Sequence, residues 1–438
     1  MILRDPVHGL VAFESEEEQL VEQLLATQEL QRLRRIRQLG VASVAFPGAE
    51  HSRFSHAIGA AFVMKQLIAR LRTLHDTLPF WQRLTASRAR DAMAAALLHD
   101  LGHGPLSHLF EDALPDTPKH EVWTERILLD DSTEVNRVLR SADPGMPARL
   151  AELVHGRDPL PYLASAVSGT FDVDRCDYLL RDAHATGVRY GLFDLDWLLR
   201  SLRFSASDDP AIVPRLAIDG AKGLPAIEGF LLARLFMFQQ VYLHKATRSA
   251  EWMIKQALRR GRQLVADGAR LEGTPRALAD AARGVPLSLG DYLELDDAVL
   301  ALTLHAWERC ADPALASLCA AIRTRALYKT YELFGGLATP TGQAEALAIG
   351  RDLARAHGMD EELSVGLDNA TCVPFDEKEP LQVVFQKGPA RALREVSFVL
   401  ARLAGQVLSR VRLVVHPSIR HELVAALAPR NGEADSRV

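Results

Sequence analysis

Helical periodicity over the first 330 residues is the feature that most constrains how this chain can fold. Through most of that stretch, apolar residues recur every three or four positions, as they do on one face of an amphipathic helix. Helices that each bury one apolar face must pack against one another, so the pattern predicts a mainly α protein. We expect helices at residues 16–39, 53–67, 88–101, 147–155, 170–184, 226–260 and 312–328.

The pattern changes near residue 330. Short β-branched runs occupy residues 381–387 and 410–415, and stretches of helical spacing separate and follow them. We therefore expect two parts: a helical body over residues 1–329 and a small α/β lobe over residues 330–438. The last eight or so residues are polar and predict a frayed tail.

The composition excludes several classes of protein. With 48% apolar and 24% charged residues, the 438-residue chain can build a core and is not globally disordered. The net charge of −5 argues against nucleic-acid binding, and the basic cluster at residues 32–37 has hydrophobic residues between its arginines. The chain has no membrane-length apolar run and no CxxC pair among its four cysteines. We expect a cytoplasmic protein that binds neither membranes nor nucleic acid.

Histidines gather in one segment of the chain. Seven of the 15 histidines lie between residues 51 and 120, and His99 is followed at once by Asp100 after an apolar helical run. A carboxylate at the end of a buried helix needs a partner, which could be an arginine or a divalent cation. His56 and Asp174 supply further nitrogen and oxygen donors, a set that Mn, Fe, Zn or Mg accepts. The pattern favours a metal site.

Asp174 begins a second polar pattern. On a helix, Asp174, Tyr178 and Asp182 are spaced at i, i+4 and i+8, so they line one face over about 12 Å. That length suits a nucleotide lying along the helix. We expect the neighbouring Asp172 and Asp177 to be ordinary solvated charges.

A third polar stripe lies in the expected helix at residues 226–260. Arg234, Tyr242 and Lys245 fall on one face of an otherwise apolar helix. Buried cations favour an anionic ligand such as phosphate. The alternative is an interior helix whose arginine pairs with a carboxylate.

Taken together, these motifs resemble a known family. The ordered set resembles the HD-domain deoxynucleoside triphosphate (dNTP) triphosphohydrolases, and the resemblance covers roughly residues 2–335. The segments that carry it are residues 5–9, 31–40, 46–56, 99–108, 120–121, 172–178 and 242–245. It implies metal-dependent hydrolysis of a dNTP to a deoxynucleoside and inorganic triphosphate.

The resemblance also implies roles for individual residues. The implied metal ligands are His56, His99, Asp100 and Asp174. The residues implied to contact the triphosphate or act in catalysis are Arg53, His103, His108, His120, Arg175, Arg234 and Tyr242. Gln38 and Asp182 would bind the sugar 3′-hydroxyl, and Tyr178 would exclude a 2′-hydroxyl. We expect His108 to protonate the leaving 5′-oxygen while Glu111 orients it.

Regulation and assembly follow from the same resemblance. It implies a homo-oligomer, either a dimer or a tetramer. Arg34, Arg325 and Lys329 resemble the phosphate-binding part of an allosteric site that accepts a nucleotide activator. In relatives that a guanine nucleotide activates, an aspartate reads the base, and here Ala26 takes that position. We therefore expect a weakened or altered guanine preference, with basal activity in the absence of an activator.

Two other functions stay open. One is a different HD-domain phosphohydrolase, such as a 5′-nucleotidase or a hydrolase of cyclic dinucleotides or alarmones. Gln38, Tyr178 and Asp182 favour a deoxyribose-facing pocket over these substrates. The other is a catalytically silent nucleotide sensor, against which the intact set of candidate ligands argues.

Overall fold

The computed structural model describes residues 1–114, 117–205, 212–373, 375 and 381–431. The expected C-terminal tail lies outside these residues except for Asn431, which is buried and donates to the Glu332 carbonyl at 2.9 Å, so it is not frayed. Within them, no helix has both the length and the apolarity that crossing a membrane requires.

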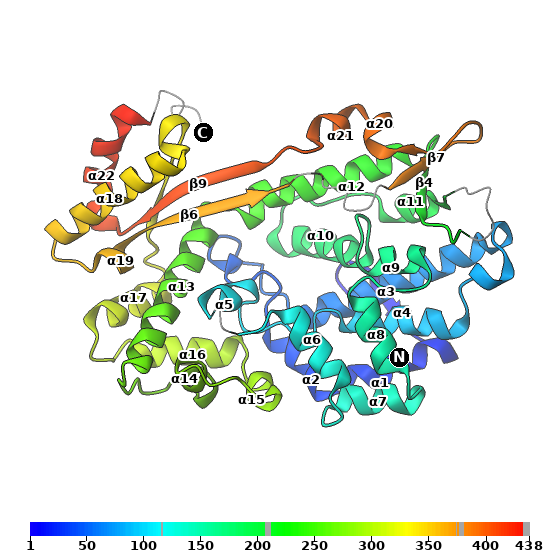
Figure 1. The fold of residues 1–438 in the computed structure, drawn as a ribbon, viewed down its shortest axis with the longest axis horizontal. Coiled ribbons are helices and arrows are strands. Elements are labelled where there is room, and N and C mark those ends of the chain that lie inside the picture. Colours follow the sequence, from blue (N-terminus) through cyan, green and yellow to red (C-terminus); the bar gives the residue numbers. More distant parts are fainter. Residues whose placement is uncertain (115–116, 206–211, 374, 376–380, 432–438) are drawn as a thin grey trace.

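The expectation of a mainly α fold is confirmed (Figure 1). Helices make up most of the chain before residue 324. They are α1 (Gln19–Leu25), α2 (Gln28–Arg32), α3 (Arg53–Thr73), α4 (Ala86–Leu98), α5 (His108–Ala113), α6 (His120–Leu129), α7 (Glu134–Ala142), α8 (Met146–Val154), α9 (Pro161–Val167), α10 (Val173–Thr186), α11 (Leu195–Arg200), α12 (Leu224–Met237), α13 (Lys245–Ala266), α14 (Arg276–Ala282), α15 (Leu289–Leu293), α16 (Asp297–Trp307) and α17 (Pro313–Arg323).

Three of these helices form the centre of the body. Helix α3 packs against both α4 and α10. Its buried face carries the small residues Ala57, Ala60 and Ala61, and the facing α4 is alanine-rich and fully buried from Ala92 to Leu98. Small side chains let helix axes approach closely, so polar groups at the ends of the three helices meet. The site described below forms there.

Two of the expected helices are broken. The stretch at residues 16–39 divides at Thr27, which has extended backbone angles and begins α2, and it then ends in a 3₁₀ turn (Leu33–Arg35). The stretch at residues 226–260 divides after a π-helical turn (Phe238–Tyr242), and α13 begins only after His244. Apolar spacing alone does not reveal such breaks, because the residues on both sides stay buried in the same core.

The strands form three small sheets. The expected run at residues 381–387 contains β7, and the expected run at residues 410–415 lies within β9, whereas the other strands were not expected. The two-stranded sheet pairs β1 (Ile2–Asp5) with β2 (Gly9–Ala12) in antiparallel register. The four-stranded sheet has the order β3 (Leu202–Phe204), β4 (Leu216–Asp219), β7 (Gln382–Val384) and β8 (Arg391–Ala392). The three-stranded sheet has the order β5 (Lys329–Glu332), β9 (Leu408–Val415) and β6 (Val365–Cys372).

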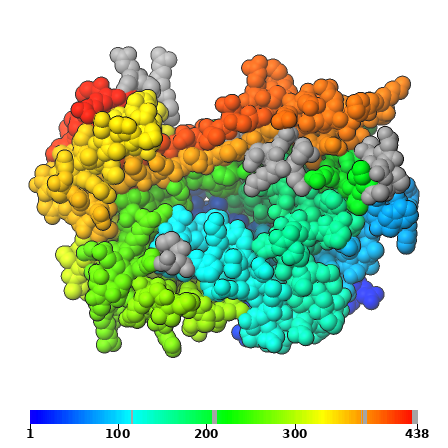
Figure 2. Space-filling view, viewed as in Figure 1, coloured from blue at the N-terminus to red at the C-terminus, as the bar shows by residue number. Residues whose placement is uncertain are grey.

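Strands β6 and β9 form a long antiparallel ribbon that crosses over the helical body (Figure 1). Helix α18 packs on both strands and on α22, and the surface beneath the ribbon is hollowed (Figure 2). The helices after residue 330 are α18 (Pro340–Ala356), α19 (Glu361–Ser364), α20 (Leu393–Val396), α21 (Phe398–Leu403) and α22 (Arg420–Leu427). Because β7 pairs in parallel with β4 of the body, one sheet contains strands from before and after residue 330. The division into two domains stays a prediction.

Close packing at Gly102 positions α6 behind the histidine-rich loop. A Cβ atom there would lie 2.1 Å from the His120 carbonyl oxygen, whereas one at Gly229 of α12 would meet nothing within 4 Å. We predict that Gly102→Ala lowers the free energy of unfolding by about 1–3 kcal/mol through overpacking. The matched Gly229→Ala should raise it by about 0.5–1 kcal/mol. Equal effects of the two substitutions in urea unfolding would contradict this account.

Candidate metal centre and its cleft

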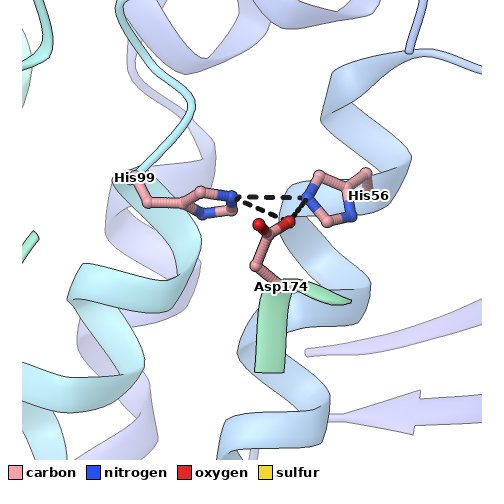
Figure 3. Close-up of side chains that lie close together, drawn as sticks. All are labelled: His56, His99 and Asp174. Atoms are coloured by element: carbon pink, nitrogen blue, oxygen red, sulfur yellow. Dashed lines mark hydrogen bonds and ion pairs between the residues drawn. The ribbon is translucent and has the colours of Figure 1, made fainter. Parts of the chain in front are cut away.

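Three side chains from three helices meet at one point (Figure 3). His56 lies in the first turn of α3, His99 follows α4, and Asp174 lies in the first turn of α10. The Asp174 Oδ1 atom is 3.0 Å from His56 Nε2 and 3.4 Å from His99 Nε2. The two Nε2 atoms are 3.4 Å apart.

Asp100 lies beside the group. Its Oδ1 is 3.4 Å from His99 Nε2 and its Oδ2 is 3.7 Å from His56 Nε2, so the two imidazoles face different oxygens of this carboxylate. Around a cation with bonds of about 2.1 Å, neighbouring donors are about 3.0 Å apart in an octahedron and about 3.4 Å apart in a tetrahedron. The donor types and the spacing of His56, His99 and Asp174 therefore fit a divalent cation.

The two imidazoles present their Nε2 atoms to this point because their Nδ1 atoms are bound elsewhere. His56 Nδ1 donates to Asp177 Oδ2 at 2.8 Å, and His99 Nδ1 donates to the Ala96 carbonyl at 2.9 Å. A hydrogen on Nδ1 leaves the lone pair on Nε2, which is the state that binds a metal.

Carboxylates dominate the electrostatics of the group. Burial disfavours a charged His56, but Asp174 and Asp177 outweigh it and raise the pKa of His56 to about 10. Burial likewise opposes ionisation of Asp100, yet Arg53 beside it holds the pKa of that carboxyl well below its usual range. The site is therefore rich in ionised carboxylate oxygens and attracts positive charge.

A second cluster of His103, Glu111 and His120 does not fit a metal. The rings of His103 and His120 are stacked, with centroids 3.9 Å apart and planes 13° from parallel. A cation bound to imidazole lies in the plane of the ring, and two stacked rings share no such point. Burial and the nearby Arg53 also hold the pKa of His103 well below its usual range, so that ring is neutral.

His108 lies at the edge of this cluster. Its Nδ1 is 3.4 Å from Glu111 Oε2, while Glu111 Oε1 accepts from His120 Nδ1 at 2.8 Å. The side chain of His108 is 70% exposed, so it can reach a ligand in the cleft. Glu111 contacts both histidines and does not itself line the cavity.

The polar face that the sequence predicts for α10 is present. Asp174, Tyr178 and Asp182 all line one cavity of about 480 Å³. Asp182 is fixed by two partners: its Oδ2 accepts from Tyr242 Oη at 2.8 Å and its Oδ1 from His51 Nε2 at 2.8 Å. His51 was not predicted from the sequence, where only its place in the histidine-rich segment pointed to it.

Most of the predicted site residues share this cavity. Gln38 also lies there, and its buried Oε1 has no hydrogen-bond partner among the described residues. The predicted residues that line the cavity are Gln38, Arg53, His99, Asp100, His103, His108, His120, Asp174, Arg175, Tyr178, Asp182 and Tyr242. His56 lies behind this wall and is fully buried.

The expected polar stripe on one long helix is wrong. Tyr242 lines the first cavity, Arg234 lines a neighbouring one beside Arg175, and Lys245 lies in a separate pocket. The π-helical turn and the break at residues 243–244 rotate the three side chains away from a common face.

The expectation that Asp172 and Asp177 are solvated is also wrong. Both are buried, and each satisfies other groups of the site. Asp172 caps α10 by accepting from the Arg175 backbone N–H at 2.8 Å, and burial raises the pKa of its carboxyl to about 6. Asp177 accepts from the Nδ1 of His56. Sequence spacing could not show that Asp172 and Asp177 are covered by other parts of the chain.

The predicted allosteric residues are only partly together. Arg325 and Lys329 line a pocket of about 370 Å³ with Lys245 and Arg420, and its described lining includes no carboxylate. The guanidinium of Arg34 instead lies over the ring of Phe54.

Comparisons with known proteins agree with the fold. The HD domain family matches residues 53–181, and the family named HD associated region matches residues 193–272. The protein YwfO of Bacillus subtilis, whose function is uncharacterised, is 34% identical over 413 residues, which span 92% of this chain and 89% of YwfO. The chain therefore belongs to the HD-domain phosphohydrolase family.

Two further relatives have more informative names. The deoxynucleoside triphosphate triphosphohydrolase SAMHD1 of Danio rerio is 25% identical over 462 residues, covering 94% of this chain and 70% of that protein. The crystal structure of a phosphohydrolase from Bacteroides thetaiotaomicron superposes with a TM-score of 0.80 at 28% identity, covering 95% of this chain and 99% of that one.

The raised pKa of His56 makes cation binding depend on pH. In the metal-free protein His56 is protonated, and its charge stabilises the folded state. This stabilisation is fully present below pH 6.5, the ordinary pKa of histidine, and it is lost as the pH rises through about 10. A cation must displace that proton. We predict release of at least one proton per cation at pH 8 and binding that tightens as the pH rises toward that pKa, because, despite burial, the pKa of His99 is raised by Asp100 and Asp174 as well. Calorimetry in two buffers of different ionisation enthalpy measures the proton release, and titrations at several pH values measure the affinity; pH-independent affinity would contradict the prediction.

Proposed function

We propose that this protein hydrolyses deoxynucleoside triphosphates to a deoxynucleoside and inorganic triphosphate. Water forms a new bond to the α-phosphorus, the bond from that phosphorus to the 5′-oxygen breaks, and the 5′-oxygen takes up a proton. The proposal makes four side chains the metal ligands: His56, His99, Asp100 and Asp174.

One juxtaposition supports the proposal above all. Three of the four candidate ligands, His99, Asp100 and Asp174, line the same cavity as the polar group of Gln38, Asp182 and Tyr242. Asp174 and Asp182 lie toward opposite ends of one face of α10. The unpartnered amide oxygen of Gln38 can accept a hydrogen bond from a sugar hydroxyl. The name of the zebrafish relative, a dNTP triphosphohydrolase, points to the same substrate.

The chain supplies the groups that the chemistry needs. A bound divalent cation would polarise a phosphate oxygen and lower the pKa of a coordinated water. His108 is the proton donor to the leaving 5′-oxygen, because it reaches into the cleft and Glu111 holds its Nδ1. His103 and His120, stacked beside it, bind phosphate oxygens.

Arginines lie where the triphosphate would extend. Arg53 and Arg175 line the main cavity, and Arg175 also lines the adjoining cavity with Arg234. The buried Nε of Arg234 has no partner among the described residues, so a phosphate oxygen can satisfy it. We therefore propose that the triphosphate extends toward the end of β6 that carries Cys372, which lines the adjoining cavity as well.

Tyr178 accounts for the choice of the deoxy sugar. Its ring lies between His56 and Tyr242, with centroids 6.5 Å and 6.4 Å from theirs. We propose that this ring occupies the space that a 2′-hydroxyl would need, so ribonucleotides are excluded by contact rather than by a missing hydrogen bond.

The basic pocket supports a second, regulatory role. Four cationic side chains converge there, and Arg325 is held by donating to the Val44 carbonyl at 2.7 Å. Such a pocket suits the phosphates of a nucleotide activator. We further propose a homo-oligomer, dimer or tetramer, in the cytoplasm, on the strength of the family resemblance.

The direct test is product analysis with each of the four dNTPs. With Mn²⁺ and no GTP, we expect deoxynucleoside plus triphosphate, because Ala26 leaves no carboxylate to require a guanine base. Anion-exchange chromatography distinguishes this from monophosphate plus pyrophosphate. Monophosphate products would favour another HD-domain phosphohydrolase, no turnover in any metal would favour a silent sensor, and turnover only with GTP would contradict the expected basal activity.

His108→Gln tests the proton donor. We expect kcat to fall by about 10²–10⁴-fold with little change in KM, because general-acid catalysis acts in the transition state. The matched control is His305→Gln, which removes an exposed histidine paired with Glu308 at the same i, i+3 spacing. Equal kcat values for the two variants would remove His108 from the mechanism.

A further inference from the structure

We propose that His8 of the N-terminal hairpin is a positioning residue for the cation site, acting through Asp177 on the ligand His56. The inference rests on the metal site of the proposed function and is independent of the dNTP substrate. The chain of contacts runs from the turn between β1 and β2, through α10, to α3.

Asp177 is the centre of this arrangement. Its side chain is fully buried, and each of its oxygens accepts two hydrogen bonds. Oδ2 accepts from His56 Nδ1 and Arg181 Nε, both at 2.8 Å. Oδ1 accepts from His8 Nε2 at 2.6 Å and from a terminal nitrogen of Arg181 at 2.9 Å. Four fixed donors leave the carboxylate one orientation, so its contact with His56 is fixed as well.

The hairpin is built to present His8. Asp5 Oδ1 accepts from the backbone N–H groups of Val7 and His8, both at 2.9 Å, which closes the turn. Asp5 Oδ2 accepts from Arg181 at 2.8 Å, so the same arginine ties the turn to Asp177. The His8 side chain is only 5% exposed, and its ring lies 5.6 Å from that of Phe62 on α3.

Helix α3 makes room for the carboxylate at Gly59, one turn after His56. A Cβ atom at Gly59 would lie 1.8 Å from Asp177 Oδ1 and 2.3 Å from Arg181. Any side chain there would displace the group that orients His56. The backbone at Gly59 is ordinary α-helix, which any residue can adopt, so its conformation does not require glycine. The close approach of Asp177 does require it.

The two histidine ligands are oriented in different ways. His99 Nδ1 donates to the carbonyl of Ala96 in its own helix, and this contact forms whenever α4 forms. His56 depends on the carboxylate of Asp177 in α10, and Asp177 in turn is held by His8, which lies 169 residues earlier in the chain. Without that support, His56 could carry its hydrogen on Nε2 and lose its lone pair for the cation.

The test compares three substitutions at one position by cation affinity, measured without substrate. In His8→Gln the side-chain amide nitrogen replaces Nε2 as donor, whereas His8→Ala removes the donor and His8→Asn is too short to reach Asp177. We expect His8→Ala and His8→Asn to weaken Co²⁺ binding about 10–100-fold in competition with a chelator. His8→Gln should restore most of that affinity. The control is His357→Ala, which removes an exposed histidine paired with Glu422.

The visible spectrum of bound Co²⁺ and thermal unfolding of the metal-free variants separate positioning from folding. We expect a changed Co²⁺ spectrum in His8→Ala, with a metal-free melting temperature close to that of His8→Gln. Unchanged Co²⁺ affinity and spectrum in His8→Ala and His8→Asn would overturn the proposal, as would equal weakening in His8→Gln. Because no nucleotide enters the assay, failure of the dNTP reaction would leave this result unaffected.

Discussion

Burial of carboxylates is the constraint on which the rest of this structure depends. Asp100, Asp174 and Asp177 lie around one histidine; Asp100 and Asp177 are buried, and the Asp174 side chain is 34% exposed where it lines the cavity. Ionised groups removed from water must be paired. Asp100 has Arg53, and Asp177 has Arg181. Among the described residues, Asp174 pairs with the imidazoles of His56 and His99. These imidazoles can release their protons when a cation binds between them and the carboxylate. The charges that stabilise the fold therefore also form a site for a metal ion.

The surrounding scaffold keeps this arrangement rigid. The loop between His99 and His108 includes Leu106 and Ser107, which adopt positive φ angles of 53° and 57° that cost energy outside glycine. Asp297 holds the Leu106 backbone N–H at 2.8 Å, and the buried Arg32 donates to the His103 carbonyl at 2.8 Å. Fixed partners on α2 and α16 thus compensate for the strain and hold His103 on a preorganised loop.

Much of the candidate site could be predicted from the sequence because its signals are local. His99 and Asp100 are adjacent, and Asp174, Tyr178 and Asp182 follow helical spacing that the structure preserves. The sequence could not reveal partners brought from far along the chain. His8 and His51 contact Asp177 and Asp182 across more than 100 residues, and no spacing rule connects them.

The fold shows the same division between local and distant signals. Helical periodicity identified α3 and α10, but it also ran through the π-helical turn before Leu243 and so misplaced Arg234 relative to Tyr242. Strand β6 was missed because its residues, Val365–Cys372, include Gly, Asp and Asn, which are depleted in strands. Its stability comes from pairing along its whole length with β9, a contact between distant segments.

Anomalous X-ray diffraction from crystals grown with Mn²⁺ tests the central claim most directly. The account predicts one strong anomalous peak within about 2.3 Å of His56 Nε2, His99 Nε2 and carboxylate oxygens of Asp100 and Asp174. A peak between His103 and His120 instead, or no peak at the quartet when the protein is saturated with metal, would contradict it.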